Sequence, residues 1–319
     1  MFRWLLILVL LLSPFTARAQ TDQLCFVQFI HPGGEHEPDS AAGRSWNTGQ
    51  HKRTFIQQAG RYLMDLNTAP IAANLMFWCE YEAPAALVKT FTDPLPDGPK
   101  FLFAPAPMAF YPHDPPLMNT DPFVFGNHFF YSICKQNNRR GPTGLQRLAR
   151  GSVILFGSGK HRSQFIVDTV FVVADYIDFN LTDYRETLKD RVPSEYFHAT
   201  LEPVVYEMQL RNHSPSQTFR LYIGATPDQP IEGMFSFFPC RPFSNTESRG
   251  FARPTIRRKG TITDNLTQGQ RMNPQPDLAA VQILWSDVTR QILEQGLCLG
   301  VQAELPKIKE LHEIGKEIN

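Results

Sequence analysis

Two apolar runs joined by a short basic turn stand in the middle of the sequence. Residues 153–179 read VILFGSGKHRSQFIVDTVFVVADYIDF and are rich in β-branched and aromatic side chains. Such runs, interrupted by turn residues, are typical of a pair of β-strands. The turn holds Lys160, His161 and Arg162, and a hairpin that only filled a core would not need that charge. We therefore expect a hairpin here whose turn has a role beyond packing.

The rest of the chain predicts a mostly antiparallel β unit with a few helices. Residues 73–84 mix apolar and acidic residues in near-alternation, which suits a strand with one wet face. Short apolar runs predict further strands at residues 24–31, 123–136, 196–209, 219–227, 233–243 and 298–305. The fold class we expect is α+β and predominantly β.

Three other segments are interpreted differently. Within residues 276–296, apolar side chains recur three and four residues apart, at Leu278, Val281, Leu284, Val288 and Ile292, which predicts an amphipathic helix. Residues 51–63 are expected to form a short helix or an irregular segment. Prolines crowd residues 92–122, which predicts a long ordered loop because proline cannot serve a central strand.

The length of 319 residues fits one elaborated domain or two, and 42% hydrophobic residues are ample for a packed core. Residues 1–20 show an arginine near the start, an apolar core too short to span a bilayer and small residues at Ala17 and Ala19, as in a secretory signal peptide. We expect a signal peptide at 1–19, a β-rich domain at 20–185 and a β-rich continuation at 186–319 that is part of the same domain or a second lobe.

The location of the protein depends on this first segment. A true signal peptide predicts a secreted or periplasmic protein, and a miscalled start codon predicts a cytoplasmic one. No later run is long enough to cross a membrane.

The five cysteines are odd in number and widely spaced, without CxxC, and each lies beside apolar residues. They therefore suit buried small hydrophobes as well as disulfides. No cofactor is expected.

Histidines and a glutamate near the start form a candidate site. The segment HPGGEH holds His31, Glu35 and His36, with His51 further on, and these side chains are suitable metal ligands. Their spacing does not match HExxH, which needs a helix to bring both histidines onto one face. We therefore favour a polar strand end for His31 and a loop-orienting role for Glu35 and His36, and we assign no catalytic residue. One alternative is a secreted or periplasmic hydrolase that uses these four residues, and another is a periplasmic interaction protein.

Aromatic and basic residues interleave between residues 119 and 162. Aromatic faces stack on unpaired bases while guanidinium groups meet phosphate, so the pattern is typical of proteins that hold single-stranded or flipped-out nucleotides. The formal charge of zero requires any such contact to come from a local patch. An ordinary β core with a solvated basic loop is the alternative. The candidate ligand-binding residues are Trp46, Trp78, Asn119, Asp121, Phe123, Asn127, Phe130, Tyr131 and Ser158. The candidate contacts to a nucleic-acid backbone are Lys135, Arg139, Arg140, Arg147, Lys160 and Arg162, and a second basic segment, residues 253–259, has no aromatics.

The order Leu148, Gly151, Ser152, then Val153 to Phe156, followed by the apolar strand 165–173, resembles the central signature of PUA-like barrels, especially their EVE and ASCH members. Ser152 stands where that signature has an acidic residue. The resemblance implies a small β-barrel core with helical and long-loop elaborations, in which these two strands form the barrel wall and residues 160–162 lie on its rim. It also implies a pocket that receives a nucleobase, often a modified one, without chemistry. The expected function is therefore non-catalytic binding of a nucleotide or a modified nucleobase in nucleic acid.

Overall fold

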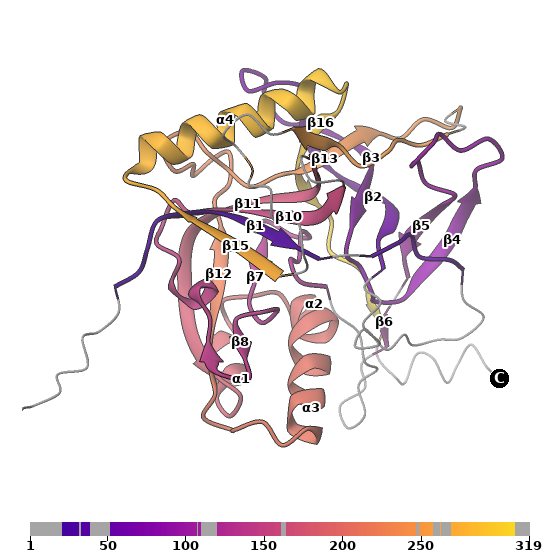
Figure 1. Cartoon of the computed structure of the whole chain (residues 1–319). Helices are drawn as coiled ribbons and strands as arrows, with labels where there is room; N and C mark the ends of the chain where they lie inside the picture. Colours follow the sequence, from indigo (N-terminus) through magenta and orange to yellow (C-terminus); the bar gives the residue numbers. More distant parts are fainter. Residues whose placement is uncertain are drawn as a thin grey trace, which may run out of the picture.

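The computed structural model describes residues 21–31, 33–38, 52–106, 108–109, 120–160, 164–246, 249–257, 262 and 269–309. These residues form an α+β fold that is predominantly β, as predicted (Figure 1). A seven-stranded sheet lies beside a six-stranded one, helix α4 covers one face of the larger sheet, and helices α2 and α3 lie beyond its other face. Strands from the two halves of the chain pair with one another in both sheets, β1 with β15 and β2 with β16.

The predicted hairpin lies inside the seven-stranded sheet. Its strands β10 (Val153–Lys160) and β11 (Gln164–Asn180) pair antiparallel, with Val153 opposite Val172. The register shifts between Phe156, opposite Thr169, and Gly157, opposite Val167, so Asp168 is the extra residue of a β-bulge. The full order is β15 (Gly269–Pro274), β1 (Cys25–Ile30), β10, β11, β12 (Thr218–Gly224) and β7 (Phe130–Tyr131), with β14 (Thr255–Arg257) also on β11.

The six-stranded sheet contains a small closed barrel. Its order is β16 (Cys298–Ala303), β13 (Phe238–Pro242), β3 (Ile71–Cys79), β2 (Thr54–Leu63), β5 (Phe101–Pro105) and β4 (Ala85–Thr90). Because β16 also pairs with β2, the strands β2, β3, β13 and β16 close into a four-stranded antiparallel barrel. The predicted small β-barrel is therefore present, but its wall is made by these strands. The hairpin β10–β11 instead lies in the open sheet, because β10 pairs with β1 and the long β11 continues onto β12.

Three segment predictions need correction. Residues 54–63 form strand β2. It was not predicted because the polar side chains of Gln57, Gln58 and Arg61 interrupt the apolar pattern of a strand. Strand β5 lies within the proline-rich stretch, with Pro105 only at its end. Residues 196–209 are not a strand but belong to α2 (Ser194–Tyr196), a π-helical segment η3 (Phe197–Leu201) and α3 (Glu202–Leu210), in which Pro203 occupies the first turn, where proline is tolerated.

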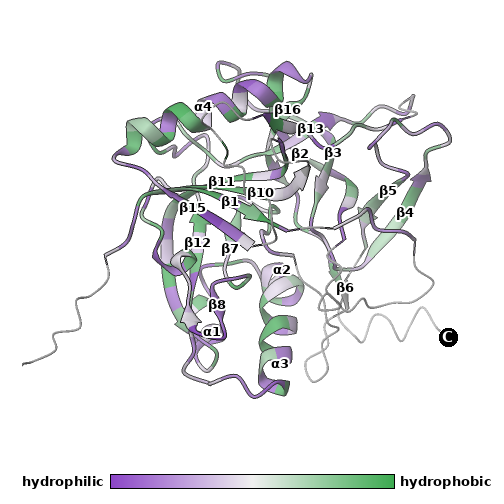
Figure 2. Ribbon diagram, in the orientation of Figure 1, coloured by the Kyte–Doolittle hydropathy of each residue, from purple (hydrophilic) through white to green (hydrophobic). Residues whose placement is uncertain are grey.

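The amphipathic helix is confirmed as α4 (Leu278–Glu294). The Asp277 side chain caps it by accepting a hydrogen bond from the Ala280 N–H at 2.8 Å. Val281, Trp285, Val288 and Ile292 are its buried apolar residues, and hydrophobic and hydrophilic residues alternate along the helix in Figure 2. The remaining elements are β6 (Met108–Ala109), β8 (Asn137–Asn138), β9 (Gly141–Pro142), β17 (Ile308–Lys309), the 3₁₀ helix η2 (Gly144–Arg147) and helix α1 (Tyr184–Leu188).

Candidate ligand-binding pocket

A pocket of about 730 Å³ lies where the end of the β10–β11 hairpin meets the barrel and the C-terminal end of α4. Its volume falls within the usual range for small-molecule sites. Apolar side chains contribute to its lining, namely Trp78, Leu95, Ile166, Phe251 and Leu297. Its charged and hydroxyl side chains are Glu35, Arg53, Asp97, Ser158, Arg241, Arg253 and Thr255. Three guanidinium groups thus share one cavity with an indole.

Arg53 is the centre of a buried charge cluster behind this pocket. Its side chain is almost fully buried, with Nε 2.6 Å from Asp168 Oδ2 and Nη1 3.2 Å from Glu80 Oε2. His31 joins the cluster, because its Nδ1 lies 2.7 Å from the same Glu80 oxygen and its carbonyl accepts a hydrogen bond from Arg53 Nη2 at 2.9 Å. Burial alone would lower the pKa of Arg53, but Asp168 and Glu80 raise it above its usual value.

Glu80 and Glu82 correct the expected wet face of strand β3. The strand itself ends at Cys79, and both glutamates follow it as buried residues, 6% and 4% exposed. A buried carboxylate requires a compensating partner. For Glu80 this partner is the Arg53 guanidinium together with His31, so the position of Glu80 is explained by the charge cluster and not by solvent.

Arg253 connects the charge cluster to the pocket. Its Nη1 lies 3.3 and 3.4 Å from the two Asp168 oxygens, and its guanidinium carbon lies 5.9 Å from the centre of the Trp78 ring. The indole N–H of Trp78 donates to the Phe251 carbonyl at 2.9 Å, and the ring packs on Phe55 at 5.1 Å. Trp78 is only 5% exposed, so it forms part of the floor, and the guanidinium group of Arg253 lies over it.

Arg241 is the pocket cation with the fewest partners. Its Nε donates to the Gly296 carbonyl at 3.3 Å, and its guanidinium carbon lies 5.4 Å from the centre of the Phe251 ring. Among the described residues no carboxylate lies within 4.0 Å of it. A guanidinium group without a counter-charge is suited to bind an anionic ligand group.

Of the residues that the structure describes, Glu35 is one of two acidic ones that line the pocket, the other being Asp97. Its Oε1 accepts hydrogen bonds from the backbone N–H groups of Lys100 and Phe101, at 2.7 and 2.9 Å. Burial raises the pKa of this carboxyl group, although the two hydrogen bonds act in the other direction. The side chain is therefore held in one orientation at the edge of the pocket.

The structure places the predicted ligand-binding residues in several different environments. Trp78 and Ser158 line the pocket. Phe123, Phe130 and Tyr131 lie in the apolar core instead, where Tyr131 stacks on Tyr222 at 5.8 Å, so they are not in the pocket. Asn127 lines a separate, smaller pocket of about 210 Å³. The described residues do not include Trp46, Asn119, His51, His161, Arg162 or the side chain of Lys160.

Asp121 has a structural position. Its carboxylate accepts hydrogen bonds from the N–H groups of Ser132, Ile133 and Cys134, at 2.9–3.0 Å, and it is 1% exposed. Burial raises the pKa of Asp121 to about 6, although these three bonds favour the ionised form. The residue therefore holds the turn that follows β7.

Replacing Asp121 with alanine is expected to lower the free energy of unfolding by about 2 kcal/mol, because three buried N–H groups lose their acceptor. Urea unfolding followed by circular dichroism measures this loss. The matched control is Asp65→Ala, since Asp65 is exposed and, among the described residues, its carboxylate accepts a single hydrogen bond, from the Asn67 N–H at 2.7 Å. Equal stabilities of the two variants would contradict the structural role of Asp121.

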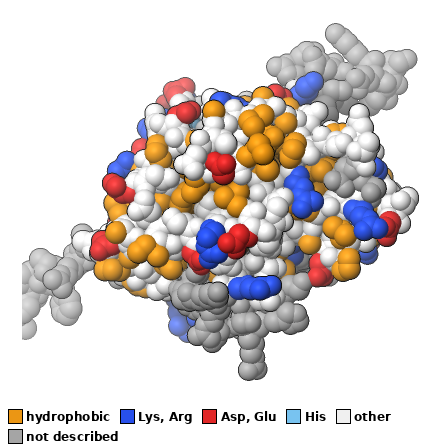
Figure 3. All heavy atoms as spheres, turned by 90° about the horizontal axis from the view of Figure 1, so that it is seen from above, with side chains coloured by type: hydrophobic (Ala, Val, Ile, Leu, Met, Phe, Trp, Pro, Cys, Tyr) orange, Lys and Arg blue, Asp and Glu red, His pale blue; other side chains and the backbone are white. Residues whose placement is uncertain are grey.

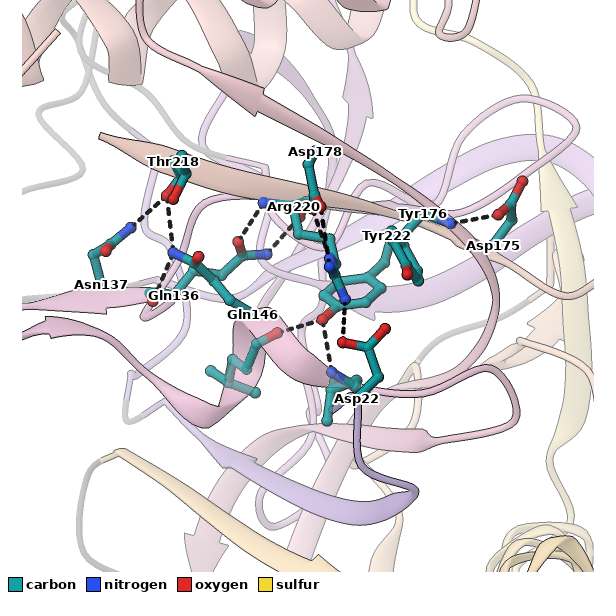
Figure 4. Close-up of polar contacts among 12 residues, drawn as sticks. Asp22, Gln136, Asn137, Gln146, Asp175, Tyr176, Asp178, Thr218, Arg220 and Tyr222 are labelled. Carbon is teal, nitrogen blue, oxygen red and sulfur yellow. Dashed lines mark hydrogen bonds and ion pairs between the residues drawn. The ribbon is translucent and has the colours of Figure 1, made fainter. Parts of the chain in front are cut away.

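Four of the six predicted backbone contacts, Lys135, Arg139, Arg140 and Arg147, lie at a different place from the pocket. Arg139 and Arg140 are exposed on the turn between β8 and β9, and Lys135 and Arg147 flank this hairpin. Side-chain amides fasten it to β12: Gln136 Nε2 donates to the Arg220 carbonyl at 2.6 Å, and Asn137 and Gln146 donate to the Thr218 carbonyl (Figure 4). None of these basic residues lines the pocket.

The cation at the centre of Figure 4 is already neutralised. Arg220 pairs with Asp22 at 2.9 Å and with Asp178 at 2.7 Å, and it lies 3.6 Å from the centre of the Tyr176 ring. Figure 3, which looks down on α4, shows basic side chains interspersed with acidic and apolar ones on the described part of that face. No continuous basic track is visible there.

The three proposed metal ligands that the structure describes, His31, Glu35 and His36, do not come together as a metal centre. His31 pairs with Glu80, His36 packs against the Phe103 ring at 5.2 Å, and Glu35 is held by backbone N–H groups. Across the described residues, no group of three or more His, Cys, Asp or Glu side chains is arranged to hold a metal ion.

Sequence reasoning missed Arg53, Asp168 and Arg241, and it placed Arg253 only in a basic segment without aromatics. The available signal was a single charged residue within an apolar strand, as in FIVDTV around Asp168. Comparison with protein-family models, with curated proteins and with solved structures finds no match to this chain. None of the helices in the described ranges is long and apolar enough to cross a membrane.

Proposed function

We propose that this protein binds a nucleotide or a modified nucleobase in the pocket described above, without transforming it. The observation that carries the proposal is the convergence of Arg241 and Arg253 on one cavity whose floor includes Trp78 and Phe251. This combination offers a cation for a phosphate group and a flat surface for a ring.

The pocket charges support different roles for the arginines. Arg53 is neutralised by Asp168 and Glu80 and is almost fully buried, so it organises the site from behind. Arg253 shares Asp168 and presents a guanidinium plane, and such planes serve as stacking surfaces for bases. Arg241 lacks a described counter-charge, so a phosphate group would bind there through charge-assisted hydrogen bonds.

The partner is therefore a nucleotide, either free or as a flipped-out base of a nucleic acid. A base inside a duplex must leave the stack before it enters such a pocket, whereas a mononucleotide or an unpaired base can enter directly. The exposed Arg139 and Arg140 would add phosphate contacts only for a strand that also crosses β12.

Arg241→Ala is expected to weaken binding of mononucleotides at least about tenfold, because a hydrogen bond to a charged group contributes about 1.5–3 kcal/mol. Isothermal titration with GMP, AMP, CMP and UMP at low salt measures the change. Arg140→Ala is the matched control, since Arg140 is exposed and outside the pocket.

The same titration tests the proposal as a whole. Absence of binding by any mononucleotide below the millimolar range, together with no binding of short single-stranded oligonucleotides, would reject it in favour of an interaction protein. Oligonucleotide affinity that falls more steeply with salt than mononucleotide affinity would instead place the bound base within a strand, at about 0.7 log units per phosphate contact per decade of salt.

A hydrolase is the second candidate, favoured by one observation. His31 Nδ1 lies 2.7 Å from Glu80 Oε2, the arrangement that orients a histidine as a general base. The parallel register of β1 and β10 ends at Ile30 opposite Gly157, so His31 and Ser158 follow side by side. Incubating the protein with nucleotides and oligonucleotides, and assaying released phosphate and base, distinguishes turnover from binding alone.

A further inference from the structure

We propose that the pocket selects guanine-class bases and that Glu35 reads their hydrogen-bonding edge. This inference rests on the proposed function, since it specifies which nucleotide the same pocket takes. It follows from the hydrogen bonds of Glu35 and from the order of donors and acceptors on the four bases.

Glu35 has one oxygen committed to the protein and one that is not. Oε1 accepts two backbone N–H groups, which uses both of its lone pairs. No hydrogen bond joins Oε2 to any described residue, although the carboxyl group is half-buried and lines the pocket. A half-buried carboxylate oxygen favours a ligand that brings N–H donors to it.

Guanine is the base that presents two donors in succession. Its N1–H and N2 amino group are neighbours on the Watson–Crick edge, and a carboxylate only accepts hydrogen bonds. Adenine and cytosine place one amino donor beside an acceptor nitrogen, and uracil has one N–H between two carbonyl groups. A carboxylate would repel those acceptors, so it discriminates against the other three bases by both attraction and repulsion.

The rest of the pocket fits this orientation. Glu35 follows β1, whereas Arg241 lies on β13, so the negative and positive groups enter one cavity from different segments. Asp168 holds Arg253, whose guanidinium group lies over the Trp78 ring. A nucleotide whose base edge meets Glu35 and whose phosphate meets Arg241 would place its ring along Arg253.

Titration of the full-length protein with GMP, IMP, AMP and CMP tests the inference. GMP is expected to bind at least about tenfold more tightly than AMP or CMP, and IMP, which lacks the N2 amino group, should lie between them. In Glu35→Gln the preference for GMP over AMP should fall below about threefold, because the amide nitrogen replaces an acceptor with a donor. Glu37→Gln is the matched control, since Glu37 is exposed and outside the pocket.

The outcomes separate this inference from the proposed function. Equal affinities for the four nucleotides in the wild-type protein, still dependent on Arg241, would overturn the guanine preference and leave nucleotide binding intact. Failure of every nucleotide to bind would overturn both. A wild-type preference for GMP that survives in a folded Glu35→Gln variant, checked by its thermal melt, would overturn the role of Glu35.

Discussion

Arg53→Met is expected to lower the free energy of unfolding by about 3–5 kcal/mol, the usual cost of removing one partner from a buried ion pair. The guanidinium bonds Asp168 at 2.6 Å and Glu80 at 3.2 Å, and both carboxylates are about 5% exposed or less. Methionine fills much of the same space but leaves Asp168 with the longer contacts from Arg253, and Glu80 with His31. The loss is thus electrostatic and not a matter of packing volume.

The pH dependence of this loss identifies its cause. Without Arg53, the buried carboxylates of Asp168 and Glu80 are more costly to keep as anions, and an acid in that position favours its neutral form. A folded state that favours the neutral acids binds protons more readily than the unfolded state does, so the variant gains stability relative to wild type as the pH falls. The deficit should therefore be larger at pH 7.5 than at pH 5.5.

Urea unfolding of both proteins at the two pH values measures this. Arg61→Met on the same strand is the control, because Arg61 is exposed, and it should change stability by less than about 0.5 kcal/mol. A deficit for Arg53→Met that is independent of pH would show that the carboxylates are not buried beside it as the structure places them.

Local sequence patterns predicted those helices and strands whose own apolar periodicity is clear. The β10–β11 hairpin, α4, β12 and β16 follow from their own apolar periodicity. Strand β2 could not be predicted in this way, because Gln57, Gln58 and Arg61 interrupt its apolar pattern. The segment 196–209 was misassigned because Val204 and Val205 favour strands locally, whereas packing against the core makes them helical.

The candidate site was predictable only in part, for a related reason. Trp78, Ser158 and Glu35 could be selected one by one as side chains suited to a ligand. What joins them depends on contacts distant in sequence: Arg53 and Asp168 are 115 residues apart, and Trp78 and the Phe251 carbonyl are 173 apart. No local pattern encodes such pairs. The aromatic residues 123–131 were therefore predicted to bind the ligand, although they are core residues.

Gly60→Ala is expected to destabilise the protein by about 3 kcal/mol, the upper part of the usual range for overpacking. Gly60 lies on β2 opposite Ala303 of β16, at the pairing that closes the barrel. A Cβ atom there would lie 2.2 Å from the Gln302 carbonyl oxygen and 3.0 Å from Leu75 Cδ1. The first of these neighbours is backbone, so a rotamer change cannot relieve the clash. Closure of so narrow a barrel therefore depends on the absence of a side chain at this position.

Gly34→Ala provides the comparison, because a Cβ atom at Gly34 would have nothing within 4 Å. We expect it to unfold at the same urea concentration as wild type, while Gly60→Ala unfolds at a clearly lower one or fails to fold. Stability of Gly60→Ala within about 1 kcal/mol of wild type would mean that β2 and β16 do not approach closely. The four strands would then form an open sheet instead of a barrel. Trp78 on β3 and Arg241 on β13 would line the pocket from positions other than those described.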